Sequence, residues 1–195
     1  MTRSFDRRPV DPALIDELVD LASRAPSAGK TQGWHAVALV GEDTARFWDV
    51  TLPAERRATF RWPRLLDAPV LLLPLADPDA YLARYSEPDK AATGLGRGAG
   101  AWPAPYWTID ASMAVMTLLL AAEDAGLGAL FFGVFRGEDE LRAELGIPDR
   151  LQLLGAVALG WPLDRPGATL PVEQPGLSAA RPRRRPDEVL HLGHW

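Results

Sequence analysis

The residue types that most often carry enzyme chemistry are scarce in this sequence. It contains no cysteine and only three histidines, His35, His191 and His194. Without cysteine the chain has no disulfides, no thiolate metal ligands and no cysteine nucleophile. Three histidines are also too few to favour a histidine-built metal centre. The sequence therefore predicts no metal site.

Two short motifs look like phosphate-binding loops but lack the context of such loops. AGKT at 28–31 resembles the end of a P-loop, but Arg24 stands where that motif requires glycine. The segment also follows a predicted helix and precedes a strand, which is the reverse of a P-loop. GLGRGA at 94–99 has the glycine spacing of a dinucleotide-binding turn, but no strand precedes it. We therefore interpret neither motif as a nucleotide site.

The composition is that of an ordinary folded domain. Of the 195 residues, 47% are hydrophobic and 24% are charged, which suits one domain with a sizeable core. The net charge of -5 disfavours a broad nucleic-acid-binding surface. The N-terminus has no apolar signal segment, and the longest apolar stretch, 111–122, is shorter than the roughly 20 residues that span a bilayer. We predict a cytoplasmic protein whose partners include neither nucleic acid nor membrane.

Helical and strand patterns alternate along the chain. Asp11 and Pro12 are typical of a helix start, and Pro26 should end that helix. A strand is expected at Trp34–Val40 and a buried strand within 67–76. The remaining expected elements are short helices within 42–60, a long helix at 108–125, a strand at 129–135, a helix at 137–145 and a last strand at 151–160.

The helix expected at 108–125 is unusual because its middle, 111–122, is apolar on nearly every face. A helix that is apolar all round is buried on all sides. A chain of this size has little material to cover every side, so we expect another subunit to provide part of the cover.

Residues 77–107 mix prolines and glycines with aromatic side chains, which is too aromatic a composition for a linker. Long loops within compact domains are usually functional. We therefore interpret this segment as a lid-like loop.

Four stretches carry a resemblance to a known family. They are TRSFDRRPVDPALIDELVDLASRAPSAGKTQGWHAVAL at 2–39, the apolar helix that leads into AGLGALFFGVF at 125–135, LGIPDRLQLLGAVALGWP at 145–162, and RPRRRPDEVLH at 181–191. In this order they resemble the FMN-dependent nitroreductase family. The resemblance implies an α+β fold in a single domain, 1–195, with a mixed sheet flanked by helices. It also implies an intertwined homodimer, with the C-terminal extension 162–195 reaching onto the partner subunit.

The same resemblance implies FMN as the cofactor and no catalytic side chain, because the flavin carries the redox chemistry. Arg3 matches the motif position whose cation faces the N1/O2 edge of the flavin. Met1 stands at the serine of that motif, so its first two arginines have no counterpart in this sequence. Gly133 and Val134 match the pair whose backbone faces the flavin N5.

Two further groups match positions that bind flavin in the family. The first is a loop that approaches from the partner subunit, matched by Pro26, Ser27, Ala28, Lys30 and Gln32. Lys30 replaces an asparagine, which adds a charge and loses the two-way hydrogen bonding of an amide. The second group reaches the phosphate and is matched by Arg181, Arg183 and Arg184.

The resemblance predicts an oxidoreductase that uses NAD(P)H in a ping-pong cycle to reduce planar acceptors such as nitroaromatics or quinones. Trp102, Tyr106 and Trp107 are candidates for lining the substrate pocket. Phe131 and Phe132 are further candidates, although core packing is the more typical role for them. The alternative is a flavin-binding or flavin-storage homologue with little turnover, or one that uses a deazaflavin-type cofactor.

Overall fold

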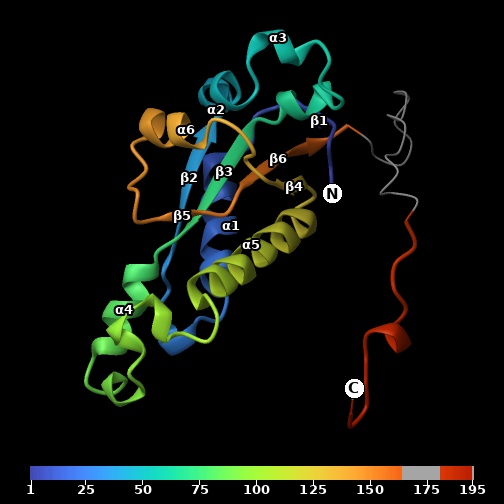
Figure 1. Cartoon of the computed structure of the whole chain (residues 1–195). Coiled ribbons are helices and arrows are strands. Elements are labelled where there is room, and N and C mark those ends of the chain that lie inside the picture. The colour runs from blue at the N-terminus through green and yellow to red at the C-terminus, as the bar shows by residue number, and fades with distance from the viewer. Residues whose placement is uncertain (164–180, 195) are drawn as a thin grey trace.

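A computed structural model describes residues 1–163 and 181–194 of the chain (Figure 1). The helices are α1 (Pro12–Ser23), α2 (Thr44–Thr51), α3 (Ala54–Arg57), α4 (Pro78–Ser86), α5 (Tyr106–Asp124) and α6 (Glu138–Leu145). The strands are β1 (Phe5–Asp6), β2 (Trp34–Val40), β3 (Val70–Ala76), β4 (Gly128–Phe132), β5 (Gln152–Leu153) and β6 (Ala156–Pro162). Among these described helices, none combines the length and apolar character needed to cross a bilayer.

The strands form one sheet in the order β1-β6-β3-β2, with β4 also paired to β6 and β5 to β3. The expected combination of one sheet with flanking helices is confirmed. Every strand pair in the described residues is antiparallel, so the parallel pairs of a mixed sheet are not among them.

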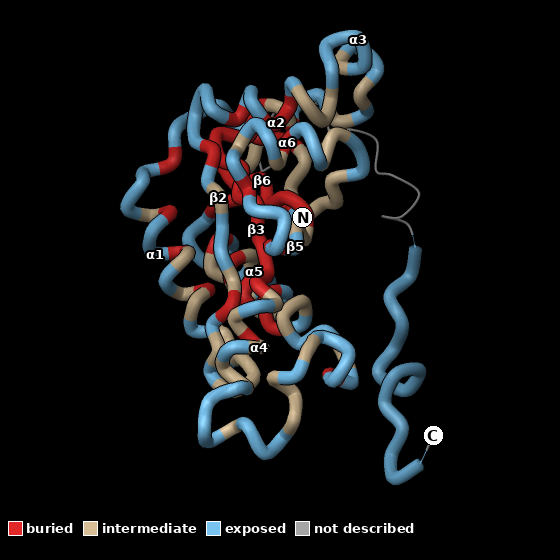
Figure 2. Tube along the Cα trace, turned by 60° about the vertical axis from the view of Figure 1, so that its left-hand side comes forward, coloured by how far each residue is buried: buried red, intermediate tan, exposed pale blue. Residues whose placement is uncertain are grey.

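The central strand β3 is buried along its whole length (Figure 2). Its side chains alternate between two cores. Val70 and Leu72 pack with apolar residues of α1 and α5. Leu71, Leu73 and Leu75 pack on the opposite face, with residues of α2 and α6. The continuous apolar run of β3 therefore reflects a sheet that is covered by helices on both sides.

The first helix begins as the sequence predicts. The Asp11 side chain caps α1 by accepting a hydrogen bond from the Ala13 N–H at 2.9 Å, and Pro12 is the first helical residue. The last predicted strand, in contrast, is split into β5 and β6. Gly155, with φ 142°, lies at the break, and a Cβ there would come within 2.5 Å of the Phe132 carbonyl oxygen. Only glycine fits this close approach of two backbones.

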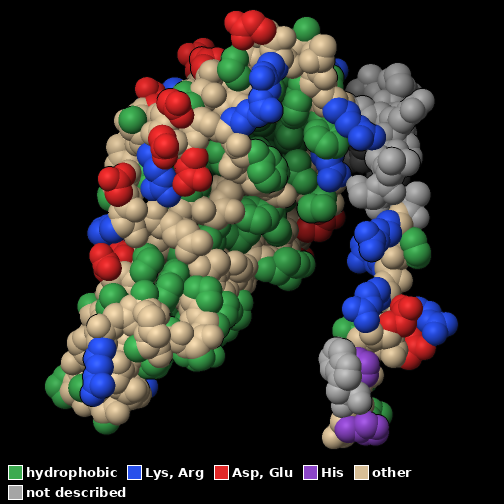
Figure 3. Space-filling view, viewed as in Figure 1, with side chains coloured by type: hydrophobic (Ala, Val, Ile, Leu, Met, Phe, Trp, Pro, Cys, Tyr) green, Lys and Arg blue, Asp and Glu red, His purple; other side chains and the backbone are tan. Residues whose placement is uncertain are grey.

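The long helix α5 is present as predicted, but one chain does not bury it all round. One side is packed against α1 and the sheet, through Ala111, Ala114, Val115 and Leu118. The other side leaves Ile109, Met116 and Leu120 exposed by 41%, 51% and 60%. Figure 3 shows hydrophobic side chains gathered over this part of the surface. The apolar face of α5 that we expected another subunit to cover is therefore exposed to solvent in the single chain.

The segment 77–107 is more ordered than the expected loop. It contains α4 and short 3₁₀ turns at 91–93, 95–97 and 99–101. Trp102 is buried at its centre, where its indole N–H donates to the Leu95 carbonyl oxygen at 3.0 Å. Aromatic rings surround this tryptophan, from Tyr81, Tyr85, Tyr106 and Trp107. The segment thus has a small core of its own, and its action as a lid stays a prediction.

Candidate functional site

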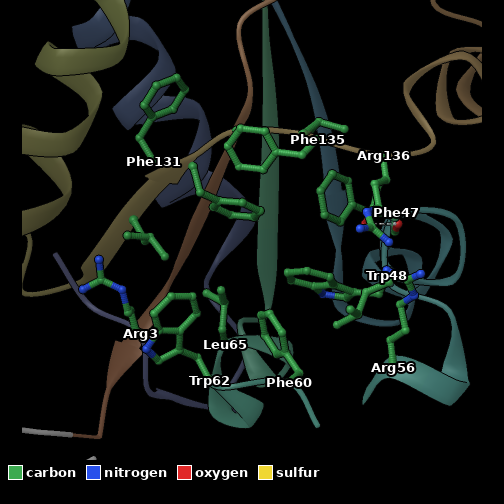
Figure 4. A pocket seen from close by; sticks show the side chains of 16 residues that line it. Arg3, Phe47, Trp48, Arg56, Phe60, Trp62, Leu65, Phe131, Phe135 and Arg136 are labelled. Carbon is green, nitrogen blue, oxygen red and sulfur yellow. Dashed lines mark hydrogen bonds between the residues drawn. The ribbon is translucent and has the colours of Figure 1, made fainter. Parts of the chain in front are cut away.

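A cavity of about 510 Å³ lies beside the end of β4, between the N-terminal arm and the segment that contains α2 and α3 (Figure 4). Its lining is mostly apolar and includes seven aromatic side chains and three arginines. The lining residues are Arg3, Phe47, Trp48, Thr51, Leu52, Arg56, Phe60, Trp62, Leu65, Leu130, Phe131, Phe132, Gly133, Val134, Phe135 and Arg136. No aspartate or glutamate is among these described lining residues, so the cavity favours an apolar, planar molecule that carries negative charge.

The aromatic wall of the cavity is held by ring packing. The Trp48 and Phe132 rings are stacked, with their planes 1° apart and their centres 5.9 Å apart. Phe47 meets both rings edge-on, and Phe60 lies against Trp48 with ring centres 6.4 Å apart. These side chains come from α2, the segment after α3 and β4, so packing between these segments fixes the shape of the wall.

Two anchors fix Arg3 at the cavity. On one side of it, the Thr2 N–H donates to the Ala129 carbonyl oxygen of β4 at 2.9 Å. On the other side, Phe5 is fully buried in the core and begins the short strand that pairs with β6. The Arg3 guanidinium carbon then lies 5.3 Å from the centre of the Trp62 ring. These two anchors restrict the position of the Arg3 backbone, so its guanidinium stays at the cavity.

Gly133 and Val134 follow β4 directly and line the same cavity as Arg3. A Cβ on Gly133 would come within 2.7 Å of the Phe135 ring, so that ring lies against the glycine. Phe135 itself is 91% exposed. The structure therefore brings three of the predicted flavin-binding residues together, and it adds Phe131 and Phe132 to their surroundings.

The loop at 26–32 lies elsewhere, next to α4 and α5. Its Ala28 N–H donates to Oδ2 of Asp110 at 2.7 Å, and the Tyr81 hydroxyl donates to the same oxygen at 2.8 Å. Both Asp110 and Tyr81 are buried, at 6% and 1% exposure. A buried carboxylate on α5 is thus paired with one donor from the loop and one from α4.

The backbone of this loop adopts a conformation that L-residues rarely occupy. Lys30 and Gln32 both have φ of 55°, in the left-handed region, and each such residue costs roughly 1–2 kcal/mol. Hydrogen bonds hold the loop there, because Gly29 accepts from the Arg84 guanidinium at 2.9 Å and the Gln32 N–H donates to Ser27 Oγ at 3.0 Å. The side chains of Lys30 and Gln32 are exposed, so the strained backbone presents them to solvent.

Two groups near the loop 26–32, Tyr81 and Asp89, have shifted pKa values. Burial raises the pKa of the Tyr81 phenol far above its usual range, and its hydrogen bond to Asp110 raises it further. Tyr81 therefore remains a hydrogen-bond donor at any physiological pH. The Arg84 guanidinium, which hydrogen-bonds Asp89, holds the pKa of that carboxyl below its usual range.

The other predicted residues do not reach the cavity within the described chain. Trp102, Tyr106 and Trp107 lie with Tyr81 around the small core next to the loop. The predicted phosphate-binding arginines, Arg181, Arg183 and Arg184, are exposed in the tail 181–194. Figure 1 shows this tail apart from the sheet. The single chain thus separates the predicted site residues into three groups.

Several residues of the site were missed from the sequence. Asp110 had a signal, because a carboxylate within an apolar helix must find partners when it is buried. Arg56 and Arg136 had none, since nothing in their spacing marks them as neighbours of Arg3. Within residues 1–163 and 181–194, no group of histidines and carboxylates could hold a metal ion.

Comparisons with known proteins identify the class. The model of the nitroreductase family matches residues 1–161, and the chain belongs to that family. It is 30% identical over 192 residues to a Thermus thermophilus protein named NADH dehydrogenase, with 88% of each chain covered. It is 26% identical over 166 residues to an Archaeoglobus fulgidus protein named NADH dehydrogenase/NAD(P)H nitroreductase, which covers 83% of this chain and 80% of that one.

A solved structure shares the fold. An FMN-dependent nitroreductase from Clostridium difficile superposes with a TM-score of 0.64 at 17% identity, covering 100% of this chain and 94% of that chain. The α+β fold expected from the resemblance is therefore confirmed, and family membership supports an oxidoreductase.

Proposed function

We propose that this chain is a flavin-dependent oxidoreductase that binds FMN in the aromatic cavity and uses NAD(P)H to reduce planar acceptors. The observation that carries the proposal is the convergence of Arg3, Gly133 and Val134 on one cavity without acidic lining. Arg3 is distant in the sequence from Gly133 and Val134, and the family resemblance independently assigns all three to the flavin ring. The names of the relatives, which refer to NADH and NAD(P)H, support a nicotinamide electron donor.

The residues of the cavity fit the chemistry of this cofactor. Bound FMN would supply the redox chemistry, by accepting a hydride and passing electrons to the acceptor. Arg3 would stabilise the negative charge that the N1/O2 edge gains on reduction, because its guanidinium has no described carboxylate partner to compete for it. The backbone of Gly133 and Val134 would face N5, and the aromatic wall would exclude water and bind the flat ring.

We propose further that a homodimer completes the site. The exposed apolar face of α5 supports this, since Ile109, Met116 and Leu120 lie open to solvent in the single chain. In such a dimer the partner's loop 26–32 would bring Ser27 and Lys30 to the flavin. Arg181, Arg183 and Arg184 would hold the flavin phosphate. The tail 162–195, of which 164–180 and 195 lie outside the described residues, would reach the other subunit.

The cofactor can be tested on the purified protein. We expect a yellow protein with flavin absorbance, and mass spectrometry of the released cofactor should identify FMN. Anaerobic NADH or NADPH should then bleach the flavin, and a nitroaromatic or a quinone should restore its colour. Parallel lines in double-reciprocal plots would support the ping-pong cycle. A colourless protein that binds no added FMN would contradict the proposal.

The dimer can be tested separately. Met116→Glu places a charge on the open face of α5, and we expect it to yield monomers in light scattering at micromolar concentration. Arg97→Glu is the control, because Arg97 is on the 3₁₀ turn at 95–97 and a new carboxylate there should leave the dimer intact. A wild-type chain that is monomeric with its flavin bound would contradict the proposed assembly.

A second candidate function is favoured by the loop at 26–32. Lys30 replaces the amide of the flavin loop. This difference favours a binding or storage protein, or a deazaflavin-type cofactor. Bound flavin that NAD(P)H does not bleach would support it.

We place the enzyme in the cytoplasm, because a nicotinamide-driven reductase depends on the cellular NAD(P)H pool.

A further inference from the structure

Two arginines besides Arg3 line the cavity without a carboxylate partner among the residues that the structure describes. Two arginines of nearby segments are paired, Arg57 with Asp49 and Arg142 with Glu138. Arg56 and Arg136 line the cavity, and neither has an ion pair with any residue in the described part of the chain. Both are exposed, so each guanidinium is available to a ligand at the rim of the cavity.

The two arginines reach the cavity from different segments. Arg56 belongs to α3, and the chain after it returns to the cavity wall through Phe60. Arg136 precedes Gly137, whose Cα is so close to the end of α2 that a Cβ there would come within 2.9 Å of the Val50 carbonyl oxygen. Figure 4 shows both arginines on the side of the cavity opposite Arg3. The cavity therefore has one cation at one side and two at the other.

The wall beside these cations is aromatic. It includes the stacked rings of Trp48 and Phe132. Aromatic rings and two guanidinium groups together match a flat molecule that carries an acidic group.

We propose that Arg56 and Arg136 form an anion subsite that binds the carboxylate of a planar aromatic acceptor. The proposal rests on the proposed function, because the acceptor must lie against a bound flavin. Arginine suits this role, since its planar fork of donors matches a carboxylate and keeps its charge at any physiological pH. The enzyme would accordingly prefer aromatic acids over neutral aromatic acceptors of the same shape.

The structure of the flavin separates this subsite from the cofactor phosphate. The ribityl phosphate chain leaves the ring at N10, which is on the N1 side and across the central ring from N5. If Arg3 faces the N1/O2 edge, the phosphate would lie on the Arg3 side of the cavity. Arg56 and Arg136 lie on the opposite side (Figure 4), where they would remain available to an acceptor.

The test compares two probes that differ in one charge, 4-nitrobenzoate and 4-nitrobenzamide. Calorimetric titration of the protein with its bound cofactor should show the acid binding about tenfold more tightly than the amide, as one or two charge-assisted hydrogen bonds allow. Arg56→Ala and Arg136→Ala should each reduce this preference about threefold, and the double variant should abolish it. Arg97→Ala removes the same charge at the 3₁₀ turn 95–97 and should retain the full preference.

Kinetics should agree with binding. The ratio of kcat/KM for the acid to that for the amide should fall in the same order across the variants, and added salt should reduce it in the wild type. Equal binding of acid and amide by the wild type would overturn the proposal.

Two other outcomes would assign the arginines to a different anion. Loss of FMN binding with unchanged riboflavin binding in Arg56→Ala and Arg136→Ala would assign them to the cofactor phosphate. Loss of a preference for NADPH over NADH, with the acid preference unchanged, would assign them to the nucleotide phosphate. A protein that discriminates acid from amide but binds no flavin would retain the subsite and refute the proposed function instead.

Discussion

The two regions that carry most of the predicted flavin residues treat polar groups in opposite ways. Around the loop 26–32, the buried groups are paired within the chain, with Asp110 accepting from Ala28 and Tyr81. Around the cavity, the guanidinium groups of Arg56 and Arg136 have no carboxylate partner among the described residues. The first region is built to hold a shape, and the second is built to receive a ligand.

This difference separates stability from binding. Pairing that is complete within the chain contributes to the free energy of unfolding and fixes a strained loop in place. Cations without internal partners contribute little to stability but make strong contacts with an anionic ligand. Substitutions in the loop region should therefore lower stability, and substitutions at the cavity should lower affinity while the fold remains intact.

The largest effect is expected at Asp110. Asp110→Ala leaves two buried donors, Ala28 N–H and the Tyr81 hydroxyl, without an acceptor, and should cost about 3 kcal/mol of unfolding free energy. Asp110→Asn keeps an oxygen that can accept and should cost about half as much. Urea unfolding measures both. Equal small losses in the two variants would show that the paired carboxylate does not hold this region.

Arg3 is expected to show the reverse behaviour. Arg3→Ala should weaken FMN binding about tenfold, or lower the flavin potential, because the reduced flavin loses a cation. Its midpoint in urea without flavin should remain close to that of the wild type.

Arg8→Ala is the matched control for Arg3. Arg8 is on the same arm and also lies over a tryptophan ring, 3.8 Å from the centre of Trp161, but it does not line the cavity. Flavin titrations should therefore separate the two variants. A similar loss of FMN affinity in both variants would show that the effect of Arg3→Ala comes from removing a positive charge from the arm and not from a contact at the cavity.

A smaller effect concerns Tyr81 and pH. Its folded pKa is raised above the value of about 10 in an unfolded chain, so unfolding releases its proton at high pH. The stabilisation is complete below pH 10 and decreases above it, by up to about 1.4 kcal/mol per pH unit. Urea unfolding between pH 9 and 11 should show this decline, and Tyr81→Phe should flatten it. An equal decline in Tyr81→Phe would assign the effect to other groups.

The fold was more predictable from the sequence than the site. Local rules sufficed for α1, where Asp11 and Pro12 mark the start, and for the apolar run of β3. That Arg3 and Gly133 lie at one cavity could be predicted only from the family resemblance. The spacing of residues along the sequence does not show which distant residues meet in the fold. Arg56 could not be predicted, since its place depends on how Phe60 and Trp48 pack.

The smallest expected effect concerns the stability of variants at the two lysines of the sequence, Lys30 and Lys90. Lys30 has φ of 55° and Lys90 has φ of -119°, so the same substitution to glycine should have opposite effects on stability. At Lys30, glycine relieves a left-handed strain of roughly 1–2 kcal/mol, of which up to about 1 kcal/mol is offset by the greater entropy of the unfolded chain.

Lys30→Gly should therefore stabilise the protein by under about 1 kcal/mol, while Lys90→Gly should destabilise it by a similar amount. If the loop also reaches the flavin of a partner subunit, Lys30→Gly should weaken FMN binding at the same time as it raises the urea midpoint. Lys90→Gly should change stability alone. If Lys30→Gly raises stability and lowers FMN affinity, this one residue affects both stability and ligand binding. The strained backbone at Lys30 would then be retained because its exposed cation contributes to FMN binding. Unchanged FMN affinity in Lys30→Gly would limit the loop to its structural role.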